Sequence, residues 1–247
     1  MPDRTYHAVI LKRRDSGETD RRLTVLTQEA GVLDVVARGA RKAASRLAGS
    51  SEPLSACILH VAEGKRNAFV TQVQPVTSFP GLRADYNRLS LGLALTEVAA
   101  AVLPHAQPAQ ESFTVVVSSL KYLEAHPKPV VAFVWAEMQL MKVAGFMPEL
   151  ETCVTCGKLV HEPNPILSPH AGGYVCAEDS GRYTDRFSTR PEVLYGLTAI
   201  ADLDAPPQNL KFAQECVAAL YPFWKAIAGW ALPANEAVAL EREEGER

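Results

Sequence analysis

The chain has 247 residues, of which 47% are hydrophobic and 21% charged, and this composition argues against wholesale disorder. The formal net charge is −3, with 25 Lys and Arg against 28 Asp and Glu, a balance that taken alone discourages a nucleic-acid-binding function. No run of about 18 apolar residues is present, so we expect no transmembrane helix. The first residues lack the long apolar stretch of a secretory signal.

The charge is unevenly distributed along the chain. Residues 1–80 contain 12 Lys and Arg against 8 Asp and Glu, a net charge of +4, while the remainder contains 13 against 20, a net charge of −7. Such asymmetry indicates two modules with different partners, although a run of charge is more often a solvated surface.

The first 80 residues contain five short β-rich runs separated by turns. These runs cover residues 6–12, 23–27, 32–37, 54–62 and 68–76. They predict a small antiparallel barrel or sandwich, and a five-stranded barrel would be the OB architecture, which often binds oligonucleotides. Between the third and fourth runs, residues 39–50 are expected to form a short helix or loop.

After Pro80 and Gly81 the pattern becomes helical. Predicted helices cover residues 83–103, 109–125, 129–144, 191–203 and 207–230. Residues 146–190 are rich in Pro, Gly, Cys and His and show no helical period.

Five cysteines, an odd number, fit a metal site in a reducing cytosol better than a disulfide framework. Cys153-x-x-Cys156-Gly is typical of a zinc knuckle, and Cys176 follows after 19 residues, the spacing expected of a second half. Cys57 and Cys216 lie in apolar stretches and are expected to be inert core thiols.

The fourth position of the double knuckle is Asp179, and a carboxylate oxygen is an accepted zinc ligand. Glu178, His161 and His170 are alternative fourth ligands. Three thiolates and one carboxylate would make a closed, structural zinc site. The alternatives are a knuckle that keeps its shape without metal and a cysteine pair that oxidises.

These patterns predict an α+β multidomain protein: an N-terminal five-stranded OB-fold barrel followed by an α-helical domain with an inserted zinc-knuckle motif. The expected parts are a DNA-binding OB domain at 1–80, a helical domain at 81–147 and 190–232, the knuckle at 148–189, and a flexible acidic tail at 233–247.

The candidate DNA contacts are the cations in and around the turns between the predicted strands. They are Arg38, Arg41, Lys42 and Arg46 first, then Lys12, Arg13, Arg14, Arg21 and Arg22, with Lys65 and Arg66 at the last turn. The 38–46 segment is preferred because it contains no acid, whereas Asp15, Glu18 and Asp20 interrupt the earlier cluster. Since residues 1–80 contain only Tyr6, Phe69 and Phe79 as aromatics, affinity should depend on phosphates more than on base stacking, and duplex binding stays open.

No catalytic motif is present: the six histidines form no HExxH, and there is no GxSxG, Walker A or GxGxxG. We therefore expect a protein that is not an enzyme. The catalytic alternative is a metal-assisted nuclease centred on the Cys and Asp cluster.

Residues 8–53 resemble the RecO family of DNA repair and recombination proteins. The matching blocks are Gly17-Glu18-Thr19-Asp20, Leu26-Thr27, Gly31 and Ala37-Arg38-Gly39-Ala40-Arg41, with the later Cys-x-x-Cys-Gly…Gly-Gly…Cys insert. The family usually has a fourth cysteine where Asp179 stands.

The resemblance implies an OB-fold domain, a helical domain and a zinc knuckle. It implies binding of single-stranded DNA, annealing of complementary strands, and a complex with RecR that helps load RecA on DNA coated by single-stranded DNA-binding protein (SSB), while binding of double-stranded DNA stays an open alternative. It further implies contact of the helical domain with the SSB tail, and a cytoplasmic, nucleoid-associated protein without a membrane partner. The alternative is a protein-only adaptor that links RecR, SSB and RecA without strong intrinsic DNA binding.

Overall fold

The computed structural model describes residues 3–43, 45, 47–64 and 67–241. The chain forms two compact units, Met1–Glu124 and Ala125–Arg247. Among the described residues, no helix combines the length and the apolar character needed to cross a membrane.

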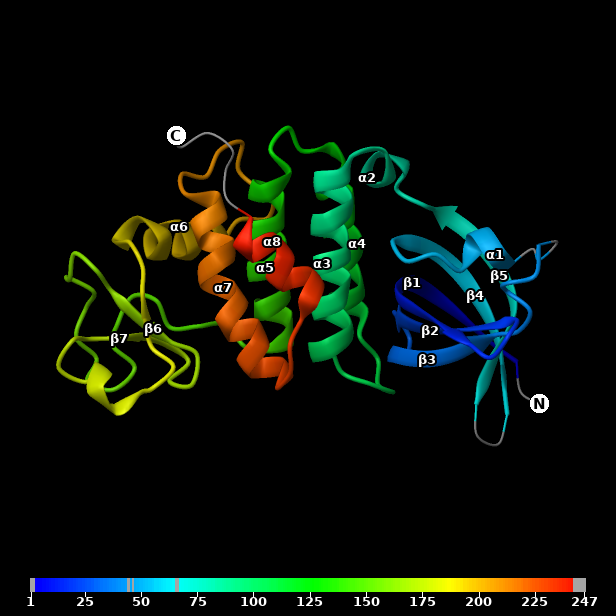
Figure 1. The fold of residues 1–247 in the computed structure, drawn as a ribbon, viewed down its shortest axis with the longest axis horizontal. Coiled ribbons are helices and arrows are strands. Elements are labelled where there is room, and N and C mark those ends of the chain that lie inside the picture. The colour runs from blue at the N-terminus through cyan, green and yellow to red at the C-terminus, as the bar shows by residue number, and fades with distance from the viewer. Residues whose placement is uncertain (1–2, 44, 46, 65–66, 242–247) are drawn as a thin grey trace. The chain divides into compact units, whose positions relative to one another are not determined.

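The first unit contains a closed five-stranded barrel (Figure 1). Its strands are β1 (Asp3–Ser16), β2 (Asp20–Thr27), β3 (Gly31–Ala37), β4 (Ser55–Glu63) and β5 (Ala68–Thr77). They follow the order β1-β2-β3-β5-β4, all neighbours being antiparallel except β3 and β5, and β4 pairs with β1 to close the barrel. The predicted α+β fold with an N-terminal five-stranded OB barrel is confirmed.

Alternation of side chains explains why these segments form a barrel. On β2 and β3, Leu23, Val25, Val35 and Ala37 lie in the core, so the residues between them face outward. The sequence runs therefore locate all five strands, although β1 extends further at both ends than its apolar centre indicates.

The β2–β3 turn requires glycine because another segment approaches it closely. Gly31 has φ +64°, and a Cβ atom there would lie 2.5 Å from the carbonyl oxygen of Pro104. The neighbouring amide of Val32 donates a hydrogen bond of 2.9 Å to the same oxygen. The segment that follows the long helix of this unit is thereby held against the barrel.

The helices of the first unit follow the barrel strands or connect them. They are α1 (Leu47–Ser50), α2 (Pro80–Ala84), α3 (Tyr86–Val102) and α4 (Gln110–Ala125). Asp85 caps α3 by accepting a hydrogen bond of 2.8 Å from the Arg88 amide. This cap explains why α3 begins at Tyr86, three residues after the predicted start at residue 83.

The second unit combines a helical bundle with a small sheet. Its elements are α5 (Pro129–Ala144), α6 (Pro191–Ala201), α7 (Ala213–Ala228), α8 (Pro233–Leu240), the strands β6 (Ile166–Ser168), β7 (Gly173–Val175) and β8 (Phe187–Ser188), and the short 3-10 helix Ser180–Arg182. Every residue from 131 to 138 in α5 is buried, so this helix forms the centre of the bundle and packs against α6 and α7.

Two predictions about the end of the chain are wrong. The last long helix begins at Ala213 rather than 207, since Pro206 and Pro207 lie in a loop. The expected flexible tail at 233–247 contains α8, in which Asn235, Val238 and Ala239 are buried. This i, i+3, i+4 pattern lies among alanines and glutamates that suggested a solvated tail. Residues 242–247 lie outside the described part of the chain.

The boundary between the two units falls at residue 124, inside residues 81–147, which are expected to belong to one helical domain. A division into two units does not test a division into four parts, so the four-part domain scheme stays a prediction.

Candidate metal centre and nucleic-acid interface

The Cys153–Cys156 segment forms a tight turn held by its own backbone. The Cys153 amide donates to the Lys158 carbonyl at 2.8 Å, and the Gly157 amide donates to the Cys153 carbonyl at the same distance. Gly157 has φ +74°, a conformation that glycine adopts without strain. The sequence Cys-x-x-Cys-Gly therefore folds locally as a knuckle.

Strand β7 brings the second half of the cluster to this turn. The Tyr174 amide donates to the Glu149 carbonyl at 2.7 Å, and the Val154 amide donates to the Tyr174 carbonyl at 3.0 Å. A Cβ atom at Gly173 would lie 2.1 Å from the Glu149 oxygen, so only glycine permits this approach. Cys176 follows directly, and its amide donates to Cys153 Sγ at 3.3 Å.

The side chains of Cys153, Cys156, Cys176 and Asp179 converge, with one ligand atom from each within 4.8 Å of the others. Cys156 Sγ lies 3.7 Å from Cys176 Sγ, and Asp179 Oδ2 lies 3.4 Å from Cys176 Sγ and 3.8 Å from Cys153 Sγ. A tetrahedral ion with metal–sulfur bonds of about 2.3 Å would hold its sulfurs about 3.8 Å apart. The four groups fit one metal ion and could bind it.

The groups of the cluster differ in how readily they lose a proton. Burial raises the pKa of Cys153, but amide hydrogen bonds outweigh it and lower the pKa to about 7. Burial raises the pKa of Cys176 to about 12, whereas hydrogen bonds from the Cys156 and Cys176 thiols lower the pKa of Asp179. A bound divalent cation would favour loss of the remaining thiol protons, since thiolate is the ligand form.

Arg182 fixes the orientation of the carboxylate. Its Nη2 lies 3.3 Å from Asp179 Oδ1, so the other oxygen, Oδ2, is the one that faces the sulfurs. Glu178 is engaged instead with Lys158 at 2.6 Å. In the described part of the chain the converging group includes Asp179 and none of the alternatives Glu178, His161 and His170.

The other two cysteines are separate from this cluster. Cys57 and Cys216 are both buried, and burial raises the pKa of Cys57 to about 11 and that of Cys216 to about 12. At neutral pH both are therefore protonated, as expected of core thiols.

The candidate DNA contacts fall into two groups that the sequence does not distinguish. Cations of the first group are tied, meaning that each pairs with an acid: Arg13 and Arg21 both pair with Glu52, at 2.9 and 3.0 Å. Arg41 lies 3.4 Å from Asp15, and its Nη1 donates to the Gly17 carbonyl at 2.9 Å. The acids come from other segments, so the absence of acids within 38–46 does not leave Arg41 unpaired. Arg46, Lys65 and Arg66 lie outside the described residues.

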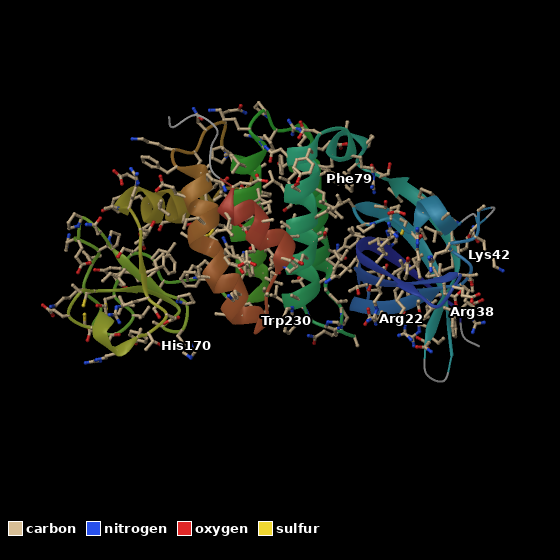
Figure 2. All side chains as sticks on the ribbon, viewed as in Figure 1. Arg22, Arg38, Lys42, Phe79, His170 and Trp230 are labelled. Atoms are coloured by element: carbon tan, nitrogen blue, oxygen red, sulfur yellow. The ribbon has the colours of Figure 1, made fainter. Side chains whose placement is uncertain are left out.

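The second group is open. Its members make no ion pair with any residue that the structure describes: Lys12, Arg14, Arg22, Arg38 and Lys42. Figure 2 labels three of them, Arg22, Arg38 and Lys42, on the barrel. None of the five is in an ion pair with a described residue, although the Asp20 carboxylate is near enough to Arg38 and Lys42 to attract both.

Strand register places two of these cations in one row across the barrel. Arg14 pairs with Arg22 across β1 and β2, Arg22 with Val36 across β2 and β3, and Val36 with Phe69 across β3 and β5. The row faces outward, because the alternate residues Leu23, Val35 and Ala37 face the core.

Two adjacent hollows lie along this outer face and share Arg22 and Asp34. One, of about 280 Å³, is lined by Lys12, Arg13, Arg14, Arg22, Thr24 and Asp34. The other, of about 440 Å³, is lined by Arg22, Asp34, Val35, Val36, Glu63, Gly64, Asn67 and Ala68. The smaller hollow is basic, whereas the larger one combines Arg22 with the carboxylates of Asp34 and Glu63.

The Gly17-Glu18-Thr19-Asp20 block stabilises the loops around this face. Asp20 Oδ1 accepts a hydrogen bond of 2.8 Å from the Gly39 amide, which is the main cause of its lowered pKa. The Arg41 amide donates to the Thr19 carbonyl at 2.9 Å. These motif residues hold the β1–β2 hairpin against the segment that carries Arg38 and Lys42.

Comparison with known proteins gives consistent matches. The chain matches the family models described as Recombination protein O N terminal, over residues 1–79, and Recombination protein O C terminal, over residues 83–223. It is similar to the DNA repair protein RecO of Heliobacterium modesticaldum, with 36% identity over 207 residues, 82% of this chain and 74% of the relative.

Two further relatives carry the same description. The Nocardioides protein is 32% identical over 233 residues, 90% of this chain and 94% of the relative. The Roseiflexus protein is 34% identical over 183 residues, 73% of this chain and 64% of the relative, so this alignment spans less than two thirds of that protein.

Proposed function

Because the chain belongs to the RecO family of DNA repair proteins, we propose that it binds single-stranded DNA along the outer face of its barrel and anneals complementary strands. The observation that carries this proposal is the open row of cations. Arg14 and Arg22 are register partners on neighbouring strands, with no acid paired to either among the described residues. Arg14 lines the smaller hollow and Arg22 lines both.

Annealing by this face needs no covalent chemistry. Two complementary strands repel each other through their phosphates, and cations that contact both strands screen that repulsion. Neighbouring strands in a sheet lie about 4.8 Å apart, so Arg14 and Arg22 can contact successive parts of one backbone. The cations supply affinity without sequence preference, which suits a protein that must pair any two complementary strands.

The partners proposed for this activity follow from the family. We expect the chain to act with RecR, to bind SSB, and through these to help load RecA on SSB-coated DNA in the cytoplasm. Duplex DNA is a second ligand, since phosphate contacts alone do not exclude it.

We also propose that the Cys153, Cys156, Cys176 and Asp179 cluster holds a structural zinc ion. When bound, zinc would crosslink the knuckle to the segment after β7, and four protein ligands would leave no open position for a substrate. Arg182 would keep Asp179 Oδ2 directed at the ion by holding Oδ1.

Binding of a naked oligonucleotide over a salt series tests the DNA-binding function. If three to five of the open cations contact phosphates, a plot of log K against log salt concentration should have a slope of about −2 to −3.5. A slope near zero, or no binding at low salt, would contradict the proposal and favour the protein-only adaptor. Metal-dependent cleavage of the oligonucleotide would instead favour a nuclease.

A further inference from the structure

The cation row of the barrel ends at an aromatic residue. Phe69 begins β5, beside Val36 of β3, and lies on the outward side because its neighbours Ala68 and Val70 pack toward the core. Its ring is half-buried. The other two aromatics of residues 1–80, Tyr6 and Phe79, are 6% and 1% exposed and cannot meet a ligand.

Arg38 covers this ring. The guanidinium carbon lies 3.9 Å from the centroid of Phe69, a distance at which the planar group rests against the ring face. Arg38 is exposed and makes no ion pair with a described residue. The phenyl ring therefore holds the guanidinium in place, while its charge and its solvent side remain available.

The adjoining hollow has a lining that suits a base better than a phosphate. Besides Arg22 and apolar Val36, it contains the carboxylates of Asp34 and Glu63. Thr24 donates to Asp34 at 2.7 Å, and Arg4 pairs with Glu63 at 2.9 Å. Carboxylates repel phosphate but accept hydrogen bonds from the amino groups of bases.

We propose that the Arg38–Phe69 pair is a stacking platform for one unpaired base of a strand whose phosphates lie on Arg14 and Arg22. Bases inside a duplex are already stacked and paired, so only a single strand can present one to this pair. The platform therefore gives the face a preference for single strands that the cations alone do not provide. This inference rests on the proposed DNA-binding function.

The test compares two fluorescent strands of equal length and phosphate count, one with bases and one built from abasic sugars. The wild-type chain should bind the base-containing strand about five- to twentyfold more tightly. Arg38→Lys keeps the charge but loses the planar group, and Phe69→Leu keeps apolar volume but loses the ring. Both should remove most of this ratio, and Phe69→Tyr should retain it.

The chain offers a matched control. Arg190 also lies over a phenyl ring, that of Phe212, with its guanidinium carbon 4.9 Å from the centroid. Arg190→Lys should leave the base-dependent ratio unchanged. Thermal unfolding of each variant checks that the barrel is intact, and Arg38→Lys, at an exposed position, keeps the test open if Phe69→Leu misfolds.

The outcomes separate the two proposals. If the wild-type chain binds both strands equally, the platform is wrong while DNA binding by the cations stands. A base-dependent ratio that survives in both Arg38→Lys and Phe69→Leu also overturns the platform. If neither strand binds, the DNA-binding function itself fails, and the platform fails with it.

Discussion

The Cys153, Cys156, Cys176 and Asp179 cluster and the basic face of the barrel differ in how far apart in sequence the contacting residues lie. In the cluster, Cys153 and Cys156 are brought together by a single turn, so their spacing identifies them directly. On the barrel, Arg21 pairs with Glu52, 31 residues away, and such a pair leaves no trace in local sequence. Sequence spacing therefore locates a site built from turns, whereas tertiary contacts determine which charged side chains are left without an ion pair.

The largest expected effect is the loss of a metal ligand. Cys153→Ser should abolish stoichiometric metal binding and lower the free energy of unfolding by at least about 3 kcal/mol, because the energy of a structural metal is folding energy. Metal analysis of the purified protein and thermal unfolding measure both effects.

His170→Ala is the matched control, since His170 lies in the same insert but outside the converging group. It should retain full metal content. Equal metal content in the wild type and Cys153→Ser would contradict a metal site at this cluster. The spacing of the cysteines would then not identify a functional site.

The next largest effect, on the pH dependence of stability, is expected at a buried hydrogen bond between residues far apart in sequence. Asn235 of α8 donates a hydrogen bond of 2.9 Å to Glu137 of α5, 98 residues away. Burial raises the pKa of Glu137 from its ordinary value of 4.5 to about 8. Between these pH values the unfolded carboxyl is ionised and the folded one is protonated, so the unfolded state binds fewer protons and stability falls as pH rises.

Glu137→Gln should remove that loss, because the amide oxygen still accepts from Asn235 and carries no charge. We expect the stability of the variant relative to the wild type to be greater at pH 8.5 than at pH 5 by a few kcal/mol, on the order of the 1.36 kcal/mol that each pKa unit represents multiplied by the shift. Denaturant unfolding at both pH values measures this, with the exposed Asp204→Asn as the control. An equal difference at the two pH values would show that Glu137 does not titrate as described.

Removal of Arg182 should have a moderate effect on the metal centre. Arg182→Ala leaves all four ligands but frees Asp179 Oδ1, and loss of such an outer contact typically lowers metal affinity about tenfold. Competition with a chelator gives the affinity. Unchanged affinity would mean that the knuckle turns alone orient the carboxylate. The cluster would then depend on local turns only, unlike the barrel face, where contacts between distant segments decide which cations are paired.

The smallest effect is expected at Arg41. Its pair with Asp15 is partly exposed, so Arg41→Gln should lower the free energy of unfolding by only about 0.5 kcal/mol. If Arg41 is tied as described, the salt dependence of DNA binding should hardly change. A decrease in slope of about 0.7 would instead identify Arg41 as a phosphate contact.

Sequence patterns predict most of the fold and part of the site. Short alternating runs locate the five strands because each needs one core-facing side, and the Cys spacing locates three residues of the group that could bind a metal ion. The Arg38–Phe69 contact is not predicted, since it depends on the parallel pairing of β3 with β5. The sequence does not predict α8, because the helix has few apolar residues and only their burial in the bundle identifies them as a core-facing side.

The most direct test of DNA binding by the open cations is strand annealing over a salt series with two double variants. Arg14→Gln with Arg22→Gln removes open cations, and Arg4→Gln with Arg41→Gln removes the same charge from ion-paired cations that line neither hollow. We predict that the open-cation variant anneals complementary strands more slowly and lowers the salt slope of binding by about 1.4, while the tied-cation variant stays close to the wild type. Equal annealing by all three proteins, or a larger loss in the tied-cation variant, would contradict the account.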